Sequence, residues 1–274
     1  MSATTSIEWT ERTWNPVTGC TKISPGCKHC YAERIADRLW KGRRFTQVRC
    51  HPERLEEPLR WRDPRLIFVN SMSDLFHEHV PDEFICRVFG AMAAAGRHTF
   101  QVLTKRPERV PGLLADAGFA NDAAVFARSD DAVLPWPLPN VWIGISAENQ
   151  RELEVRWPFL AEVPAAVRFL SLEPLLEPIK RLPPADWVIV GGESGPKARP
   201  CSVDWIRAIL AHCRAGGIPC FVKQLGARPI ASRADHRWRT SFRDPWTPRL
   251  RDRKGGEPGE WPQDLRVREW PRAA

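Results

Sequence analysis

The stretch LIFVNSMSD, residues 66–74, joins four apolar residues to a short polar run that ends on a carboxylate. An apolar run of this length, with β-branched and aromatic members, favours a strand buried on both faces, as in a parallel sheet. The polar run would then lie at the carboxyl end of that strand. In barrels and in open α/β sheets, ligands are bound at this edge.

Five further segments have the same apolar character, and an amphipathic helix is predicted in most of the intervals between them. The strands are expected at Thr99 to Leu103, Val141 to Ile145, Val167 to Leu170, Trp187 to Val190 and Pro219 to Val222. The helices are expected at residues 31–40, 82–95, 107–115, 149–160 and 203–215. This alternation predicts an α/β fold with a parallel sheet, either a barrel or a doubly wound sheet.

Polar clusters follow all six predicted strands. They are NSMSD (70–74), TKR (104–106), SAEN (146–149), SLEP (171–174), GGESG (191–195) and KQ (223–224). Each cluster alone is compatible with a helix cap or a tight turn. Six of them at one edge of a sheet predict an active site there.

Composition indicates a folded protein with a basic surface. Of the 274 residues, 43% are hydrophobic and 27% are charged, which is typical of globular proteins, and the formal net charge is +8. Residues 1–14 contain no apolar run, and no later segment approaches the roughly 20 apolar residues of a membrane span. We therefore expect a cytoplasmic protein without a membrane partner.

The last 48 residues carry most of the excess charge. From Ala227 to Ala274 there are twelve Lys or Arg against seven Asp or Glu, together with four tryptophans. Basic residues interleaved with aromatics suit either a nucleic-acid surface or an irregular extension packed by its tryptophans. The expected organisation is a barrel over residues 1–226 and a basic extension, packed on the barrel, over residues 227–274.

Three of the eight cysteines, Cys20, Cys27 and Cys30, lie within eleven positions and before the first predicted helix. Because cytosolic thiols are kept reduced, a metal-binding or catalytic use is favoured over a disulfide. Three thiolates without an obvious fourth ligand suit a [4Fe–4S] cluster with one open iron. A zinc site remains an alternative, in which Cys50 and His51 could complete four ligands with the C-x2-C pair Cys27 and Cys30.

The motif CTKISPGCKHC, residues 20–30, resembles the hallmark of the radical S-adenosylmethionine (radical SAM) superfamily. Members carry three cysteines in a loop after the first strand of a partial (β/α)6 barrel, usually as C-x3-C-x2-C. Here the first gap is six residues, and His29 stands where an aromatic residue is common. The resemblance implies a partial (β/α)6 barrel of the radical SAM type.

Seven longer segments resemble a family of phage-associated and bacterial proteins that share a three-cysteine motif. The resemblance extends from Ile7 to Pro271 and rests on WNPVTGCTKISPGCKHCYAER, FVNSMSDLFHE, QVLTKRPER, VWIGISAENQ, SLEPLL, DWVIVGGESGPKARP and FVKQLG. The SMSD segment is also similar to the second-strand motif of spore photoproduct lyase and its relatives, which act on DNA lesions.

The radical SAM resemblance implies a role for individual residues. Cys20, Cys27 and Cys30 would bind three irons, and SAM would chelate the fourth. Ser73 and Asp74 would hold the SAM amino group, a suitable pairing for an ammonium. The remaining cofactor contacts would come from Lys105 or Arg106, for the SAM carboxylate, and from Ser146 and Glu148, for the ribose. The expected catalytic residues on the substrate side are Glu173, Glu193 and Lys223, together with Gln224.

The implied activity is reductive cleavage of SAM, with an external electron donor, followed by hydrogen abstraction from a substrate. The basic extension and the lyase-like segment favour nucleic acid as substrate, for lesion repair or base modification. A small molecule or a peptide is a second expectation for the substrate. A non-catalytic zinc-binding nucleic-acid module is the alternative from a different class.

Overall fold

The computed structural model describes residues 5–127, 134–231, 248 and 250–271. The chain divides into two compact units. Unit 1 comprises Met1–Ile23, Cys30–Ile145 and Arg156–Arg168, and unit 2 comprises Ser24–His29, Ser146–Val155 and Phe169–Ala274. The cysteine motif is therefore shared, because Cys20 and Cys30 belong to unit 1 whereas Cys27 belongs to unit 2.

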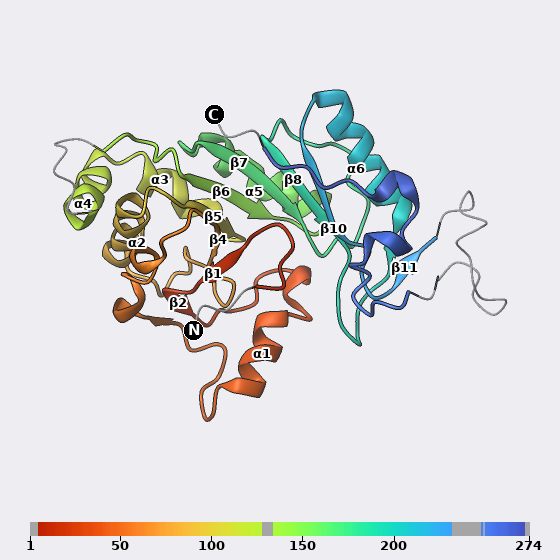
Figure 1. Cartoon of the computed structure of the whole chain (residues 1–274), viewed down its shortest axis with the longest axis horizontal. Helices are drawn as coiled ribbons and strands as arrows, with labels where there is room; N and C mark the ends of the chain where they lie inside the picture. The colour runs from red at the N-terminus through yellow and green to blue at the C-terminus, as the bar shows by residue number, and fades with distance from the viewer. Residues whose placement is uncertain (1–4, 128–133, 232–247, 249, 272–274) are drawn as a thin grey trace. The chain divides into compact units, whose positions relative to one another are not determined.

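Seven strands form one sheet, and their order in the sheet follows their order in the chain (Figure 1). They are β1 (Arg12–Trp14), β4 (Leu66–Val69), β5 (Thr99–Thr104), β6 (Val141–Ser146), β7 (Val167–Leu172), β8 (Trp187–Gly191) and β10 (Cys220–Gln224). The pairings within each unit are parallel. The α/β prediction with a parallel sheet is confirmed. A sequential order without a switch point is consistent with a partial barrel rather than with a doubly wound sheet.

Unit 1 contains strands β1, β4, β5 and most of β6. Its helices include α1 (Tyr31–Leu39), α2 (Asp82–Ala94), α3 (Val110–Leu114) and α4 (Ala117–Ala127), and the short strands β2 (Val17–Thr18) and β3 (Arg49–Cys50) pair antiparallel. Strand β1 was not predicted from the sequence. It is only three residues long, and its Trp14 is fully buried, with the ring 5.8 Å from that of Phe100.

Helix α4 lies in residues 116–139, a stretch rich in Ala, Asp and Pro, a composition typical of a surface insertion. Its Phe119 and Ala123 are buried, and the Phe119 ring lies 5.5 Å from that of Phe89 in α2. The first part of this stretch therefore belongs to the core of unit 1. Residues 128–133 fall outside the described residues.

Unit 2 contains β8, β10 and most of β7, with helix α6 (Val203–Gly216) and the short parallel pair β9 (Cys201–Ser202) and β11 (Pro229–Ile230). Helix α6 begins where the sequence predicts, because the Ser202 side chain accepts a hydrogen bond from the Asp204 N–H at 3.3 Å. Helix α5 (Gln150–Glu162) starts in unit 2 and ends in unit 1.

The described part of the basic C-terminal region lies along β10. Its backbone pairs with that strand through Val222 N to Val267 O, at 2.8 Å, and Glu269 N to Cys220 O, at 3.0 Å. Trp261 is buried, and its indole N–H donates to the Gly255 carbonyl at 3.0 Å. Residues 232–247, 249 and 272–274, which hold much of the predicted nucleic-acid surface, lie outside the described residues.

Among the described helices, none combines the length and the apolar composition needed to cross a membrane.

Candidate functional site

The cysteines fall into two groups by burial. None of the eight is in a disulfide; Cys20, Cys27, Cys30 and Cys50 are partly exposed, whereas Cys86, Cys201, Cys213 and Cys220 are buried. Burial raises the pKa of Cys86 and of Cys201 to about 12, so these two thiols stay protonated at neutral pH. The thiols accessible to a metal or an iron–sulfur cluster are therefore the three of the motif and Cys50.

In unit 1, the chain around Cys20 is fixed by its backbone. Gly19 N donates to the Met72 carbonyl and Cys20 N to the Phe45 carbonyl, both at 3.0 Å. Gly19 has φ of 94°, and a Cβ there would collide with the Gln47 carbonyl, so only glycine suits this position. Cys20 and Cys30 both pack against a small apolar cluster formed by Ala32, Ala36 and Phe45.

Thr21, the next residue, is held by two side chains of unit 1. Its hydroxyl lies 2.9 Å from His77 Nε2, and Arg106 donates to both its hydroxyl, at 2.6 Å, and its carbonyl, at 3.2 Å. Arg106 also pairs with Glu78 at 2.6 Å. Burial, aided by the Arg106 charge, lowers the pKa of His77 and keeps its ring neutral. Arg106 therefore fixes the position of Thr21, the residue of the motif that follows Cys20.

In unit 2, the turn that carries Cys27 is bound by Glu148. The Gly26 N–H donates to Glu148 Oε1 at 2.6 Å, and the Glu148 side chain is completely buried. A Cβ on Gly26 would lie 2.9 Å from Glu148 Cδ, closer than real side chains approach. Glycine at position 26 thus allows the buried carboxylate of Glu148 to accept a hydrogen bond from the backbone next to Cys27.

A second carboxylate of unit 2, Glu193, holds the same turn from both sides of Cys27. Its oxygens accept from Arg199 N at 2.8 Å, Nε at 2.9 Å and Nη2 at 2.6 Å, and from His29 Nδ1 at 3.1 Å. Arg199 in turn donates from Nη1 to the Pro25 carbonyl at 2.9 Å. Burial opposes the ionisation of Glu193, but the hydrogen bonds from Arg199 and His29 outweigh it and lower its pKa to about 2.

Three of the residues predicted on the substrate side lie together in unit 2. Lys223 Nζ donates to both oxygens of Glu173, at 2.8 and 2.9 Å, and Gln224 Nε2 donates to Glu173 Oε1 at 3.0 Å. Ser146 Oγ donates to the Glu173 carbonyl at 3.2 Å. The Lys223 and Glu173 side chains are only 16% and 18% exposed. This juxtaposition follows from their places at the carboxyl ends of β7 and β10. Glu193 binds the cysteine turn instead.

The residues predicted to hold the SAM amino group make contacts within unit 1. Asp74 is buried, and its carboxylate accepts from Thr104 Oγ1 at 2.7 Å, Phe76 N at 3.0 Å and Lys105 N at 2.9 Å. Ser73 Oγ donates to the Val17 carbonyl at 2.8 Å. Asp74 therefore ties the end of β4 to the end of β5, whatever it binds in addition.

Replacement of Asp74 by asparagine should lower the free energy of unfolding by about 1 to 3 kcal/mol, because an amide N–H₂ would face donors that now meet a carboxylate oxygen. Urea denaturation of the protein without cofactor measures this loss. Asp37→Asn is the matched control, since Asp37 is exposed on α1 and should leave the midpoint unchanged. Equal midpoints for the Asp74 variant and the wild type would contradict this structural role.

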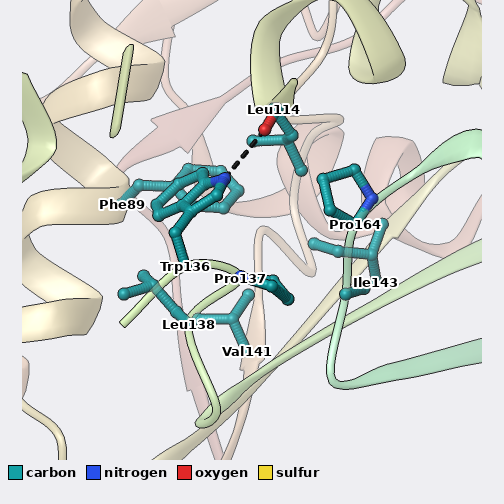
Figure 2. A pocket seen from close by; sticks show the side chains of 9 residues that line it. Phe89, Leu114, Trp136, Pro137, Leu138, Val141, Ile143 and Pro164 are labelled. Carbon is teal, nitrogen blue, oxygen red and sulfur yellow. Dashed lines mark hydrogen bonds between the residues drawn. The ribbon is translucent and has the colours of Figure 1, made fainter. Parts of the chain in front are cut away.

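A small apolar pocket in unit 1 is a further hollow in the fold (Figure 2). The Trp136 indole N–H donates to the Leu114 carbonyl at 2.8 Å, drawn as a dashed line in Figure 2. No charged side chain is among its lining residues, which are Phe89, Leu114, Trp136, Pro137, Leu138, Val141, Ile143, Pro164 and Ala165. None of these side chains is titratable, so the lining offers no acid, base or charged group for a ligand.

Sequence reasoning missed the residues that hold the motif, namely Arg199, His77 and Thr21. The only signal for Arg199 was its place just after the GGESG cluster, and no pattern links position 29 with position 193. Within the described residues, no group of three or more His, Cys, Asp and Glu side chains is arranged to hold a metal ion.

Comparison with known proteins gives one match. The model of a family described as "Protein of unknown function (DUF5131)" matches residues 4–248. No curated protein and no solved structure matches the chain.

Proposed function

We propose that this chain, which belongs to the DUF5131 family, is a radical SAM enzyme that holds a [4Fe–4S] cluster through Cys20, Cys27 and Cys30. The supporting observation is the state of these thiols. None of the three is in a disulfide, and all three are partly exposed on one short segment directly before α1. Of the other five cysteines, Cys50 is also partly exposed. The remaining four are buried.

The chemistry of the donors fits an iron–sulfur cluster. Thiolates are the usual ligands of such clusters, and three of them leave one iron for a substrate or cofactor. The backbone next to Cys20 is fixed by Gly19 and Thr21, and that next to Cys27 by Glu148 and Arg199. Since metal binding commonly completes the ordering of its own ligands, the full set would form when the cluster binds.

Each group of residues would have a distinct task. When bound, the cluster would supply the electron, received from an external donor, that cleaves SAM. Asp74 and Lys105, joined at the ends of β4 and β5, would contact SAM together with Ser73. Ser146 and Glu148 would contact its ribose, while Glu148 also fixes the turn at Gly26. Glu173 and Lys223, paired at the strand ends, would orient the substrate and exclude water.

The proposed substrate is nucleic acid, in a lesion repair or a base modification. The net charge of +8 supports this choice, because a basic surface attracts phosphate chains. A target base in a duplex would have to leave the stack before hydrogen abstraction. A small molecule or a peptide is the alternative substrate.

The zinc-binding alternative needs further ligands outside the cysteine motif, and the candidates are Cys50 and His51. In unit 1 both ring nitrogens of His51 have partners, Thr18 Oγ1 at 2.8 Å and Glu53 Oε1 at 2.9 Å. The contacts of His51 therefore favour a structural histidine over a zinc ligand.

Anaerobic reconstitution tests the proposal. The expected product is a brown protein with about four irons per chain. With a reductant and SAM, it should release methionine and 5′-deoxyadenosine. Colourless protein that binds one zinc per chain and leaves SAM intact would overturn the proposal in favour of the zinc-binding module.

A further inference from the structure

Residues 34–54, here called the arginine segment, concentrate positive charge within unit 1. They contain seven Lys or Arg and two Asp or Glu, a net charge of +5, equal to that of the C-terminal 48 residues in fewer than half as many positions. Six of the seven basic residues are arginines. The segment starts in α1 (Figure 1), runs through the loop that follows and ends after β3, and all of it is described.

Four of these cations are exposed and uncompensated. Arg38, Lys41, Arg44 and Arg49 are exposed, and none of them pairs with a carboxylate in the part of the chain that the structure describes. Of the two acidic residues in the segment, Glu53 already hydrogen-bonds to His51 at 2.9 Å. A set of exposed cations without counter-charges is available to an external anion.

Arg43 gives the segment a fixed backbone. Its guanidinium stacks over the Trp40 ring at 4.3 Å and donates to the Thr18 hydroxyl at 2.9 Å, the Thr18 carbonyl at 2.8 Å and the Gln47 carbonyl at 2.6 Å. The loop between α1 and β3 is thereby tied to β2. The four exposed cations consequently stand on an ordered scaffold and lose less freedom when they bind a ligand.

The electrostatics of Arg43 report the same concentration of charge. Burial lowers the pKa of Arg43, and the nearby positive charges of Arg49 and Arg54 lower it further. Arg54 is itself held in place, because its Nη1 donates to the Asn15 carbonyl at 3.1 Å. The positive potential in this part of unit 1 is therefore a property of the folded chain and not only of its composition.

We propose that the arginine segment binds the phosphate backbone of a nucleic acid, through Arg38, Lys41, Arg44 and Arg49. Arginine presents a planar fork of donors that matches a phosphate, and each neutralised phosphate releases counterions. Because the basic residues of the segment are mostly arginines and not lysines, we favour a nucleic acid as the ligand over an anionic membrane surface. The inference rests on the proposed function only for what the bound strand is used for.

The segment is also joined directly to the cysteine motif. Helix α1 begins at the residue after Cys30, and Arg38 lies seven positions further, roughly 10 Å along the helix axis. A strand bound here would be held within reach of the motif. This gives the proposed enzyme a means of retaining its polymer that is separate from the carboxylates and the lysine assigned to the reaction.

The test compares two four-residue variants of the full chain. In the first, Arg38, Lys41, Arg44 and Arg49 are all replaced by glutamine. The control replaces Arg62, Arg151, Lys180 and Arg214 by glutamine, which are also three arginines and one lysine and are also exposed. Fluorescence anisotropy with a labelled DNA duplex and a labelled single strand, at several salt concentrations, measures affinity and its salt dependence.

The first variant should bind at least about tenfold more weakly at 100 mM salt, and the slope of log K against log salt should become shallower by about 3 to 4. The control should change by less than about threefold, as expected for net charge alone. The double variant Arg38→Gln with Arg44→Gln should lie between wild type and the first variant. It keeps the test decisive if the larger set of changes affects folding.

Several results would overturn the inference: equal weakening in both four-residue variants, wild-type protein that does not bind DNA, or tighter binding to anionic lipid vesicles or polyglutamate. The assay needs neither a cluster nor SAM. A chain that takes up no iron but loses DNA binding in the first variant would refute the proposed function and support this inference. A SAM-cleaving chain whose DNA binding is unaffected by the substitutions would do the reverse.

Discussion

Replacement of any one of Cys20, Cys27 and Cys30 by alanine should reduce the iron bound after reconstitution from about four atoms to less than about one per chain. Each variant removes one of three thiolates, and two thiolates hold a cubane cluster poorly. The visible absorption of the cluster should disappear together with the release of 5′-deoxyadenosine. Iron analysis and absorption spectroscopy measure the loss, and circular dichroism of the unloaded protein verifies that the variants fold.

Cys50→Ala is the matched control, because Cys50, like the three cysteines of the motif, is partly exposed and not in a disulfide. This variant should keep its iron and its cleavage of SAM. Loss of the metal in Cys50→Ala, with retention in Cys20→Ala, would show that the ligand set is a different one. The six-residue gap after Cys20 would then have no part in binding the cluster.

The second large effect concerns Glu193 and acid stability. The pKa of Glu193 falls from its ordinary value of 4.5 to about 2 in the folded protein. A carboxylate with a lowered pKa stabilises the fold above pH 4.5, and this contribution is lost as the pH falls from 4.5 to about 2. Over that range the wild type should lose on the order of 3 kcal/mol of its free energy of unfolding through this group.

Glu193→Gln should abolish that part of the acid dependence. It should also lower the stability at pH 7 by about 2 to 4 kcal/mol, because the Arg199 guanidinium loses its ionic partner. Urea denaturation of the unloaded protein between pH 2 and pH 7 provides the measurement. Glu177→Gln is the control, since Glu177 is exposed, and its acid dependence should equal that of the wild type. An unchanged profile for Glu193→Gln would show that Glu193 is not the carboxylate responsible.

The sheet could be read from the sequence because its strands are buried on both faces. All six apolar segments became strands of the sheet, and the helices between them have nearly the expected bounds. Strand β1 was not predicted because three residues of mixed polarity carry no periodic signal. Its Trp14 is buried through contacts with parts of unit 1 that are distant in sequence. The buried face of α4 was not predicted because alanine dominates its sequence.

The site was predictable to the extent that it follows from strand ends. Glu173, Lys223 and Gln224 lie together because the carboxyl ends of parallel strands meet at one edge, and that rule needs no knowledge of side chains. The hydrogen bond between His29 and Glu193, by contrast, joins residues 164 positions apart. A contact of this kind depends on the rotamers of particular side chains, on which the spacing of residues carries no information.

The long gap between the first two cysteines can be understood from what lies inside it. Compared with the three-residue gap common in radical SAM proteins, the six-residue gap adds chain, and it contains the Pro25 carbonyl and the Gly26 N–H that Arg199 and Glu148 bind. A shorter gap would have to omit these two main-chain groups or move them. The longer gap thus supplies main-chain hydrogen-bonding groups. Through them Arg199 and Glu148, both distant in sequence, fix the backbone of the segment that carries Cys27.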